Sequence, residues 1–321
     1  MRALVIGGAG FLGSSLVDRL LAEEHRVDVI DDLSTGTLAN LADARLGGRR
    51  LRFHQLDVRD PALVDLVVAL SPEVVFHLAQ PSSAELGYDE PVRDAEIGLI
   101  GTLRVLEGAR LARSRKVVVA ASAALYGRLS DAELPAHEHL ALRPVAPEGI
   151  RQRAVMDYLA SYRERYGLEF SVLACSSIYG PRELEGAEPG IVGRLISDLR
   201  AGRRATIRAD AATTVDLLFV DDAVDAFSRA AQRGSGLLLN IASGEEVALG
   251  ALGALVTRLS RMPVSCAGAG TPTARRLVLD PARAELHLAW RPFTSLVDGV
   301  AATLAAAGLL VASPAGGEAR R

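Results

Sequence analysis

Short apolar runs alternate with longer segments of helical periodicity through the first half of the chain. The apolar runs are rich in Val, Ile and Leu, which is typical of strands that are buried on both faces of a parallel sheet. We predict strands at residues 3–6, 26–30, 51–56, 74–78, 116–121 and 169–174, and helices at 11–23, 92–113 and 151–166. Strands and helices in this alternation predict an α/β fold with a doubly wound parallel sheet.

The pattern changes after about residue 180, where a segment with two prolines and three glycines (180–190) predicts a loop between two lobes. Beyond this loop we expect helices at 191–201, 248–261 and 296–307, strands at 217–220 and 237–241, and a helix capped by Asp221 that runs to Arg233. The expected organisation is a first domain at 1–175 with 213–242 packing back on it, a smaller α/β lobe at 176–212 and 243–308, and a disordered tail at 309–321.

The composition indicates which kinds of binding partner and which cellular compartment to expect. The 321 residues are 49% hydrophobic with a formal net charge of −3, so a large core is possible and no nucleic-acid or anionic-membrane partner is indicated. No apolar stretch reaches the roughly 18 residues of a membrane span, so we expect no transmembrane helix. Glycines interrupt the apolar run at the N-terminus, so we expect no signal peptide. Two cysteines, Cys175 and Cys266, favour a reducing cytoplasm, and no metal site is expected.

A glycine-rich loop joins the first predicted strand to the first predicted helix. Gly7 permits a tight turn, Gly10 lets the backbone approach a pyrophosphate at the helix N-terminus, and Gly13 lets the helix pack closely on the strand. Strand, G-x-x-G-x-x-G and helix in this order predict a Rossmann-type dinucleotide site.

Acidic residues after the next two strands support the same site. Asp31, followed by Asp32, is placed to accept hydrogen bonds from the adenosine ribose and to repel the 2′-phosphate of NADP, so we expect NAD as the cofactor. The alternative is that the pair only caps the turn into residues 33–36. Asp57 is expected to bond the adenine amine, and His77 to be a buried structural residue. The residues expected to contact NAD are Gly7, Gly10, Phe11, Leu12, Gly13, Asp31, Asp32, Asp57, Val58, Leu78 and Ala79.

Taken together, these segments resemble the extended short-chain dehydrogenase/reductases, and within them the NAD-dependent sugar-nucleotide epimerase/dehydratase family. The resemblance covers almost the whole chain. Its further motifs are Gly101-Thr102-Leu103, Ser122-Ala123-Ala124-Leu125-Tyr126-Gly127, Ile178-Tyr179-Gly180-Pro181-Arg182, Val220-Asp221-Asp222-Ala223, Asn240-Ile241-Ala242-Ser243-Gly244 and Trp290-Arg291-Pro292. It implies a cofactor domain with a smaller substrate-binding lobe, and a homodimer formed through the helices at 92–113 and 151–166.

The family's chemistry, as the resemblance implies it, uses three side chains. A serine or threonine holds the reacting oxygen, a tyrosine takes the hydroxyl proton, and a lysine four residues later supports the tyrosine and the nicotinamide ribose. Ser122 matches the serine. Dehydratases and sugar-acid decarboxylases of the family carry acidic residues directly after it, whereas this chain has Ala123 and Ala124, which favours the UDP-glucose/UDP-galactose 4-epimerase branch.

The tyrosine and the lysine are both missing. In the register fixed by the flanking residues, the family's Pro-Tyr-Gly-x-Ser-Lys falls on residues 147–152, so Glu148 stands at the tyrosine position and Gln152 at the lysine position. Lys116 is the only lysine of the chain, and no tyrosine lies four residues before it. We expect Glu148 to replace the tyrosine as base and Gln152 to hold the ribose; the alternative is that Glu148 is an exposed acid at a helix N-terminus.

Further departures lie among the residues that the resemblance assigns to the substrate. Val215 replaces the family's diphosphate-gripping arginine, Ser177 and Gly98 replace asparagines, and Arg275 or Arg276 is either a diphosphate contact or a solvated charge. The candidate substrate residues are Ser82, Ala123, Ser177 and Arg276.

Three functions follow from this pattern. The first is an atypical NAD-dependent sugar-nucleotide epimerase or a related carbohydrate oxidoreductase. The second is a non-catalytic NAD-binding sensor or partner subunit, and the third is a non-redox lyase or isomerase in which NAD is structural.

Overall fold

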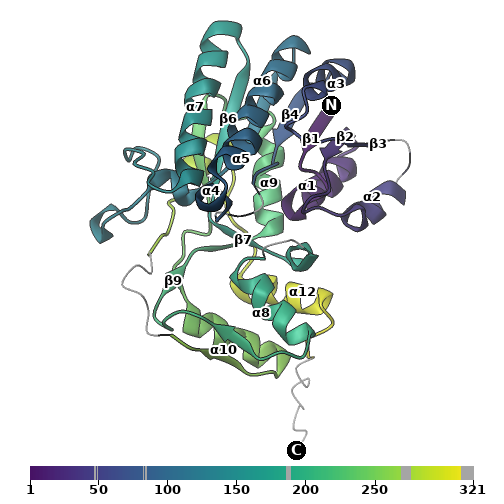
Figure 1. Ribbon diagram of the computed structural model, residues 1–321. Coiled ribbons are helices and arrows are strands. Elements are labelled where there is room, and N and C mark those ends of the chain that lie inside the picture. Colours follow the sequence, from purple (N-terminus) through teal and green to yellow (C-terminus); the bar gives the residue numbers. More distant parts are fainter. Residues whose placement is uncertain are drawn as a thin grey trace, which may run out of the picture.

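Seven parallel strands form the central sheet of the protein, in the order β11-β6-β5-β4-β1-β2-β3 (Figure 1). The computed structural model describes residues 1–46, 48, 50–81, 83, 85–185, 189–268 and 276–311. The strands are β1 (Arg2–Ile6), β2 (Arg26–Asp31), β3 (Leu51–Gln55), β4 (Val74–His77), β5 (Lys116–Ser122), β6 (Glu169–Cys175) and β11 (Leu237–Ile241). The strand order reverses between β1 and β4, and such a switch point is where open α/β sheets bind their ligands. The predicted doubly wound fold is confirmed.

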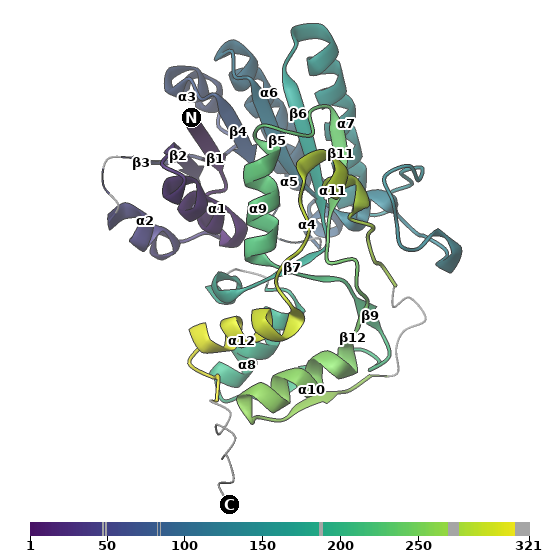
Figure 2. The same ribbon diagram turned by 180° about the vertical axis from the view of Figure 1, so that it is seen from behind.

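Helices cover both faces of this sheet because its strands are apolar on both sides. Along β1, Val5 belongs to one core cluster while Leu4 and Ile6 belong to the other. One face is covered by α3 (Ala62–Leu70), α6 (Gly101–Leu111) and α7 (Pro147–Tyr166), the last two turned to the viewer in Figure 1. The other is covered by α1 (Phe11–Ala22) and α9 (Val220–Ala230), and α9 stands in front of the sheet in Figure 2.

The long helix expected at 92–113 is a continuous helical stretch with a change of pitch. It consists of α5 (Pro91–Ala95), a π-helical turn (Glu96–Ile100) and α6. The helix expected from Arg151 begins four residues earlier, because Pro147 takes the first helical position, where its missing N–H costs no hydrogen bond. Glu148 therefore lies in the first turn of α7, one turn before Gln152.

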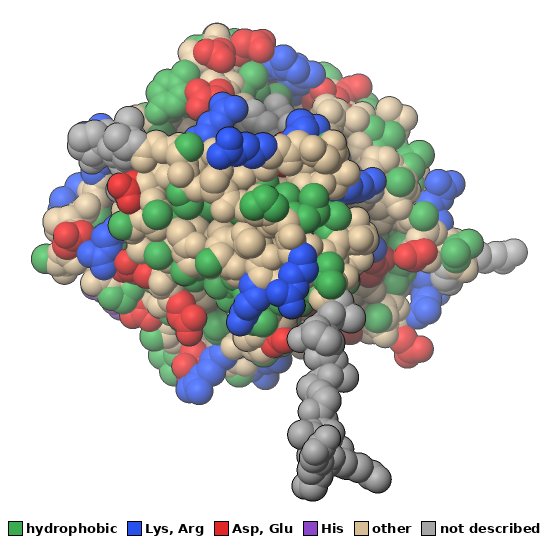
Figure 3. Space-filling model, turned by 90° about the horizontal axis from the view of Figure 1, so that it is seen from below, with side chains coloured by type: hydrophobic (Ala, Val, Ile, Leu, Met, Phe, Trp, Pro, Cys, Tyr) green, Lys and Arg blue, Asp and Glu red, His purple; other side chains and the backbone are tan. Residues whose placement is uncertain are grey.

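The smaller lobe lies below the sheet in Figure 1 and is built from short strands and three helices. Its helices are α8 (Ile191–Arg200), α10 (Leu249–Ser260) and α12 (Leu296–Ala306), and its paired strands are β8 (Ala205–Ile207) with β13 (Val264–Cys266), and β9 (Thr214–Val215) with β12 (Val247–Ala248). Seen from below, its surface mixes basic, acidic and apolar side chains (Figure 3).

The remaining elements are short. They are α2 (Ala42–Leu46), α4 (Leu86–Asp89), α11 (Ala282–Leu288), the parallel pair β7 (Ser177–Tyr179) and β10 (Leu217–Phe219), and the 3-10 turns η1 (Leu38–Leu41), η3 (Ala123–Tyr126), η4 (Asp131–Glu133) and η5 (Pro181–Glu185). No helix among the described residues is both long and apolar enough to cross a membrane.

Two sequence-based predictions at element ends are wrong. Asp221 does not cap α9, because the helix begins at Val220 and its N-cap is Phe219. The neighbouring Asp222 has a different role, since its buried carboxylate accepts the amides of Phe293 and Thr294. The tail does not begin at residue 309, because the amide of Val311 donates to the carbonyl of Leu259. Residues 312–321 lie outside the described part of the chain.

Candidate active site

The glycine loop between β1 and α1 is shaped by backbone contacts that leave no room for side chains. Gly7 has a φ of +84°, and a Cβ there would lie 2.7 Å from the amide nitrogen of Ala79. A Cβ on Gly13 would collide with the carbonyl oxygen of Gly7. Gly10 is the N-cap of α1, and the first turn of this helix carries no acidic side chain. The loop therefore fits an anionic pyrophosphate at the helix N-terminus.

Asp31 ties the end of β2 to this loop. Its buried carboxylate accepts the amide of Ala9 at 2.9 Å and the amide of Leu33 at 2.9 Å. Burial raises the pKa of Asp31, while these two amides act in the opposite direction. Asp32 accepts the amide of Ser34 at 2.9 Å, so both acids also hydrogen-bond the turn at residues 33–36, as the capping alternative expects. The ribose contact of Asp31 remains a prediction.

The other expected NAD residues lie along the same edge of the sheet. Leu78 and Ala79 both donate their amides to the carbonyl of Ile6, which holds the segment after β4 against the glycine loop. Asp57 accepts the amide of Arg59 at 2.7 Å and its guanidinium at 2.6 Å, and the hydrogen bonds from Arg59 lower the pKa of Asp57. Val58 is buried against Gly101.

Ser122, Glu148 and Gln152 meet at the carboxyl end of β5. Ser122 is the last residue of that strand, and its hydroxyl donates to Glu148 Oε1 at 2.7 Å. Gln152 accepts the Ser122 amide at 3.1 Å and donates its own Nε2 to Glu148 Oε1 at 3.2 Å. The three residues that the sequence selected as catalytic thus form one hydrogen-bonded group, with Glu148 half-buried and Gln152 buried.

Arg151 is a buried cation that sequence reasoning missed. Its Nε lies 3.1 Å from Asp94 Oδ2, and its Nη1 donates to Gln80 Oε1 at 2.6 Å. A Cβ on Gly98, in the π-helical turn, would collide with the guanidinium of Arg151. The sequence does show that Gly98 and Arg151 both differ from the residues usual in the family. It does not show that the missing side chain at Gly98 makes room for the guanidinium of Arg151.

His77 is the last residue of β4 and is fully buried. Its Nε2 is 2.9 Å from Thr102 Oγ1, whose own proton is donated to the carbonyl of Gly98 at 2.7 Å. Nε2 of His77 is therefore the protonated nitrogen. Burial, with a smaller effect from the charge of Arg151, lowers the pKa of His77 to about 4, so the ring is neutral.

The comparisons with known proteins identify the family. The profile of the NAD dependent epimerase/dehydratase family matches residues 3–242. The chain belongs to this family. It is 38% identical to a UDP-glucose 4-epimerase of Mycolicibacterium smegmatis, over 95% of this chain and 97% of the relative.

Solved structures agree with this assignment. A UDP-glucose 4-epimerase of Thermotoga maritima with UDP-glucose has a TM-score of 0.86 at 31% identity, covering 95% of this chain and 98% of that one. A UDP-glucose 4-epimerase of Thermus thermophilus in complex with NAD has a TM-score of 0.87 at 29% identity, covering 96% and 99%. NAD is accordingly the cofactor of this epimerase/dehydratase-family protein.

Neither Tyr126 nor Lys116 supplies the missing tyrosine or lysine of this family member. Tyr126 is fully buried and donates its hydroxyl to Asn240 Oδ1 at 2.6 Å, and burial raises its pKa. Lys116 is fully buried at the opposite, amino end of β5, where it donates to the carbonyl of Arg233. Burial lowers the pKa of Lys116 to about 8.

Only one of the described candidate substrate residues of this epimerase/dehydratase-family protein adjoins Ser122 in the chain. Ala123 is buried in η3, next to Ser122, and Ser177 is exposed at the start of β7. Arg276 is already ion-paired with Glu246 at 2.6 Å and with Asp131 at 3.3 Å. Ser82 lies outside the described residues, as does Arg275, the alternative to Arg276. The substrate roles of Ser82, Ala123, Ser177 and Arg276 remain predictions.

Proposed function

We propose that this protein is an atypical NAD-dependent sugar-nucleotide 4-epimerase, or a related carbohydrate oxidoreductase, in which Glu148 is the general base. The observation that carries the proposal is the 2.7 Å hydrogen bond between Ser122 Oγ and Glu148 Oε1. A base must lie within hydrogen-bond reach of the proton it takes, directly or through one bridging group. The named relatives, UDP-glucose 4-epimerases, support a sugar nucleotide as the substrate class.

The chain's own residues would divide the work as follows. Ser122 Oγ holds the reacting hydroxyl of the sugar, and the proton of that hydroxyl passes to Glu148 directly or across Ser122. Gln152 fixes the carboxylate of Glu148 through its Nε2 and the end of β5 through its Oε1. NAD, when bound, supplies the acceptor and donor of the hydride at the sugar carbon. Ala123 and Ala124 bring no acid to the site, which favours epimerisation over dehydration.

Glu148→Gln tests this proposal, because the amide keeps the size and the hydrogen-bonding capacity of the side chain but cannot take a proton. We expect kcat for interconversion of UDP-glucose and UDP-galactose to fall about 100- to 10,000-fold, the usual worth of a general base. The NAD content of the purified protein should not change. Glu164→Gln, at an exposed acid near the other end of α7, is the matched control. Undiminished turnover in Glu148→Gln would overturn the role of Glu148.

The non-catalytic alternative rests on the same hydrogen bonds. Ser122 and Gln152 both donate to Oε1 of Glu148, and a purely structural acid would also accept such hydrogen bonds. A wild-type protein that retains NAD but turns over no member of a sugar-nucleotide panel would favour a sensor or partner subunit. Product formed by a variant that binds NAD but cannot transfer hydride would favour the non-redox lyase or isomerase.

We also propose a cytoplasmic homodimer formed through the helical stretch at 92–113 and the helix at 151–166. Its support is a set of exposed apolar side chains on these elements. They are Val92, Ile100, Leu111, Tyr158 and Tyr166.

A further inference from the structure

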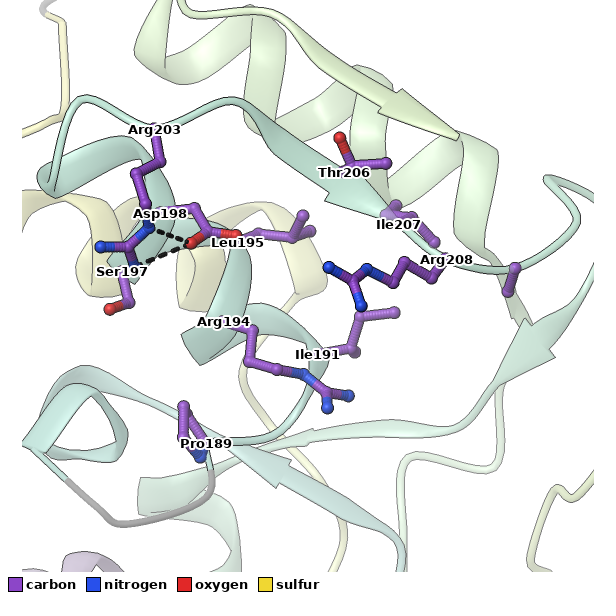
Figure 4. Close-up of a pocket in the computed structure, with 11 residues that line it drawn as sticks. Pro189, Ile191, Arg194, Leu195, Ser197, Asp198, Arg203, Thr206, Ile207 and Arg208 are labelled. Carbon is purple, nitrogen blue, oxygen red and sulfur yellow. Dashed lines mark hydrogen bonds and ion pairs between the residues drawn. The ribbon is translucent and has the colours of Figure 1, made fainter. Parts of the chain in front are cut away.

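Arg151, near the start of α7, is the only buried arginine among those that the structure describes. The arginines of the smaller lobe are exposed, as at the cavity of about 600 Å³ between α8 and β8, where Arg203 is paired with Asp198 (Figure 4). Removing a guanidinium from water is costly, and well-packed apolar side chains often stabilise a fold as well as a buried ion pair does. The burial of Arg151 therefore points to a role beyond stability.

The guanidinium of Arg151 joins three segments that are distant from α7 in the sequence. Its Nε lies 3.1 Å from Oδ2 of Asp94, on α5, and its Nη1 donates to Oε1 of Gln80 at 2.6 Å. It also fills the space beside Gly98 in the π-helical turn, where an added Cβ would lie 2.6 Å from the guanidinium carbon. The helix that carries Glu148 is thereby tied to the segment that follows β4.

Gln80 continues the stretch of backbone that lies against the glycine loop. The two residues before it, Leu78 and Ala79, donate their amides to the carbonyl at the end of β1 at 2.9 and 3.0 Å. A sheet of this kind binds one half of a dinucleotide on each side of its switch point. Asp31 and the glycine loop lie on the β1–β2 side, so the nicotinamide half is left with the β4–β5 side, which carries Gln80 and Ser122.

We propose that Arg151 is a positioning residue, which fixes Gln80 relative to Glu148 and thereby holds the nicotinamide half of NAD against the base. Arg151 and Glu148 are three residues apart on α7, so a shift of Gln80 relative to one of them is a shift relative to both. Asp94 balances the charge of the guanidinium, which therefore acts through its fixed hydrogen bonds rather than as a free cation. This role rests on the proposed function for its effect on turnover, but not for its effect on NAD.

Displacement of NAD from the purified holoprotein by ADP-ribose tests this role without any turnover. ADP-ribose lacks only the nicotinamide ring, so the excess of ADP-ribose that releases half of the bound NAD measures how firmly the ring is held. Gln80→Leu and Arg151→Gln should each lower this excess about 10-fold, as expected for the loss of one hydrogen bond to a charged group. The affinity for ADP-ribose itself should change less than about twofold in both variants.

Three further variants sharpen this test. Gln80→Leu leaves the ion pair of Arg151 and Asp94 in place, so it remains informative if Arg151→Gln folds poorly. Gln80→Glu keeps an acceptor oxygen for the guanidinium and should not lower the excess of ADP-ribose. Arg153→Gln, at an exposed arginine of the same helix, is the matched control and should behave as the wild type. Arg151→Lys keeps the charge but not the two-pronged donor geometry, so it should resemble Arg151→Gln.

An excess that is unchanged in both Gln80→Leu and Arg151→Gln would refute the positioning role. Equal weakening of NAD and ADP-ribose would also refute it, because that is the result of a purely structural residue. In turnover of UDP-glucose, both variants should lower kcat about 100-fold with little change in KM, the usual cost of misplacing reacting groups by about 1 Å. A wild type that turns over no sugar nucleotide would contradict the proposed function and leave the displacement result standing.

Discussion

Glu148 accepts hydrogen bonds from a serine and an amide where its relatives place a phenol. A carboxylate is a weaker base than a phenolate, so it depends more on its immediate donors and on the exclusion of water. Here Ser122 and Gln152 both bond Oε1, and no cation contacts this oxygen directly in the described structure. A glutamine at position 152 suits a carboxylate base better than a lysine, because a neighbouring ammonium would lower the proton affinity of the carboxylate and so weaken it as a base.

Gly98 and Arg151 are expected to be energetically coupled. Gly98→Asn should cost about 1–3 kcal/mol of unfolding free energy, because the new side chain enters space filled by the Arg151 guanidinium. Arg151→Ser should cost about 3–5 kcal/mol, because it leaves the Asp94 carboxylate buried without its partner. The double variant should cost less than the sum by at least about 1 kcal/mol, because the guanidinium with which the asparagine collides is then gone.

Urea unfolding of the four proteins measures this coupling. Gly167→Asn is a suitable control, because Gly167 ends α7 with a φ of +70° that asparagine tolerates and has nothing within 4 Å of its added Cβ. Strict additivity of the Gly98 and Arg151 effects would contradict the coupling.

The sequence predicted which residues meet at the end of β5 better than it predicted their surroundings, while their catalytic roles remain predictions. Counting from the flanking motif placed Glu148 and Gln152, four residues apart on one helix face, beside Ser122. It could not predict that Arg151 is buried, because an arginine in a helix is ordinarily solvated and only the missing side chain of Gly98 makes room for it.

The helices at 91–111 and 147–166 pack against the same face of the sheet and leave apolar side chains outward. Leu111 is 47% exposed on α6 and Tyr158 is 44% exposed on α7. Such side chains on neighbouring helices are typical of a helical dimer interface. The π-helical turn between α5 and α6 shifts the helical register next to the catalytic group, a common place for such turns.

The double variant Leu111→Glu/Tyr158→Glu should convert the proposed dimer to a monomer at micromolar concentration, because it places carboxylates inside an apolar contact. Light scattering after gel filtration gives the mass directly. Leu286→Glu, at a 77% exposed position on α11, should leave the dimer intact. A wild-type protein with the mass of one chain would contradict the interface.

Helices and strands whose hydrophobic residues follow a clear pattern were predicted to within a few residues. Elements too short to show such a pattern were not predicted. The strands of the central sheet have four to seven residues and are mostly apolar, so the pattern identified them. β8, β9, β12 and β13 have only two or three residues, too few to show any period. The start of α7 was missed because proline and glycine flank Glu148, and these residues usually mark a loop rather than a first turn.

Two buried titratable groups should give the whole molecule opposing responses to acid. His77 has a pKa of about 4, below its ordinary 6.5, so the unfolded chain binds more protons between these values and stability falls as the pH drops through them. Burial raises the pKa of Glu183 to about 7, above its ordinary 4.5, so the folded chain binds more protons there and stability rises as the pH drops. Each effect is worth about 3 kcal/mol at most, and they nearly cancel.

Single variants should separate these effects. Between pH 7.5 and 5, His77→Gln should become more stable relative to the wild type, and Glu183→Gln less stable. Comparing each variant with the wild type by urea unfolding at both pH values cancels the contributions of other groups. A pH dependence that is identical in all three proteins would mean that neither group titrates with folding.

The burial of Lys116 has a practical consequence for handling the protein. Since it is the only lysine, the native surface offers no side-chain amine to acylating reagents, aldehyde fixatives or lysine-directed cross-linkers. Its amine becomes reachable only when β5 parts from the turn that carries Arg233, which precedes the edge strand β11. The extent of modification at this one residue therefore measures the fraction of molecules in which this part of the fold has opened.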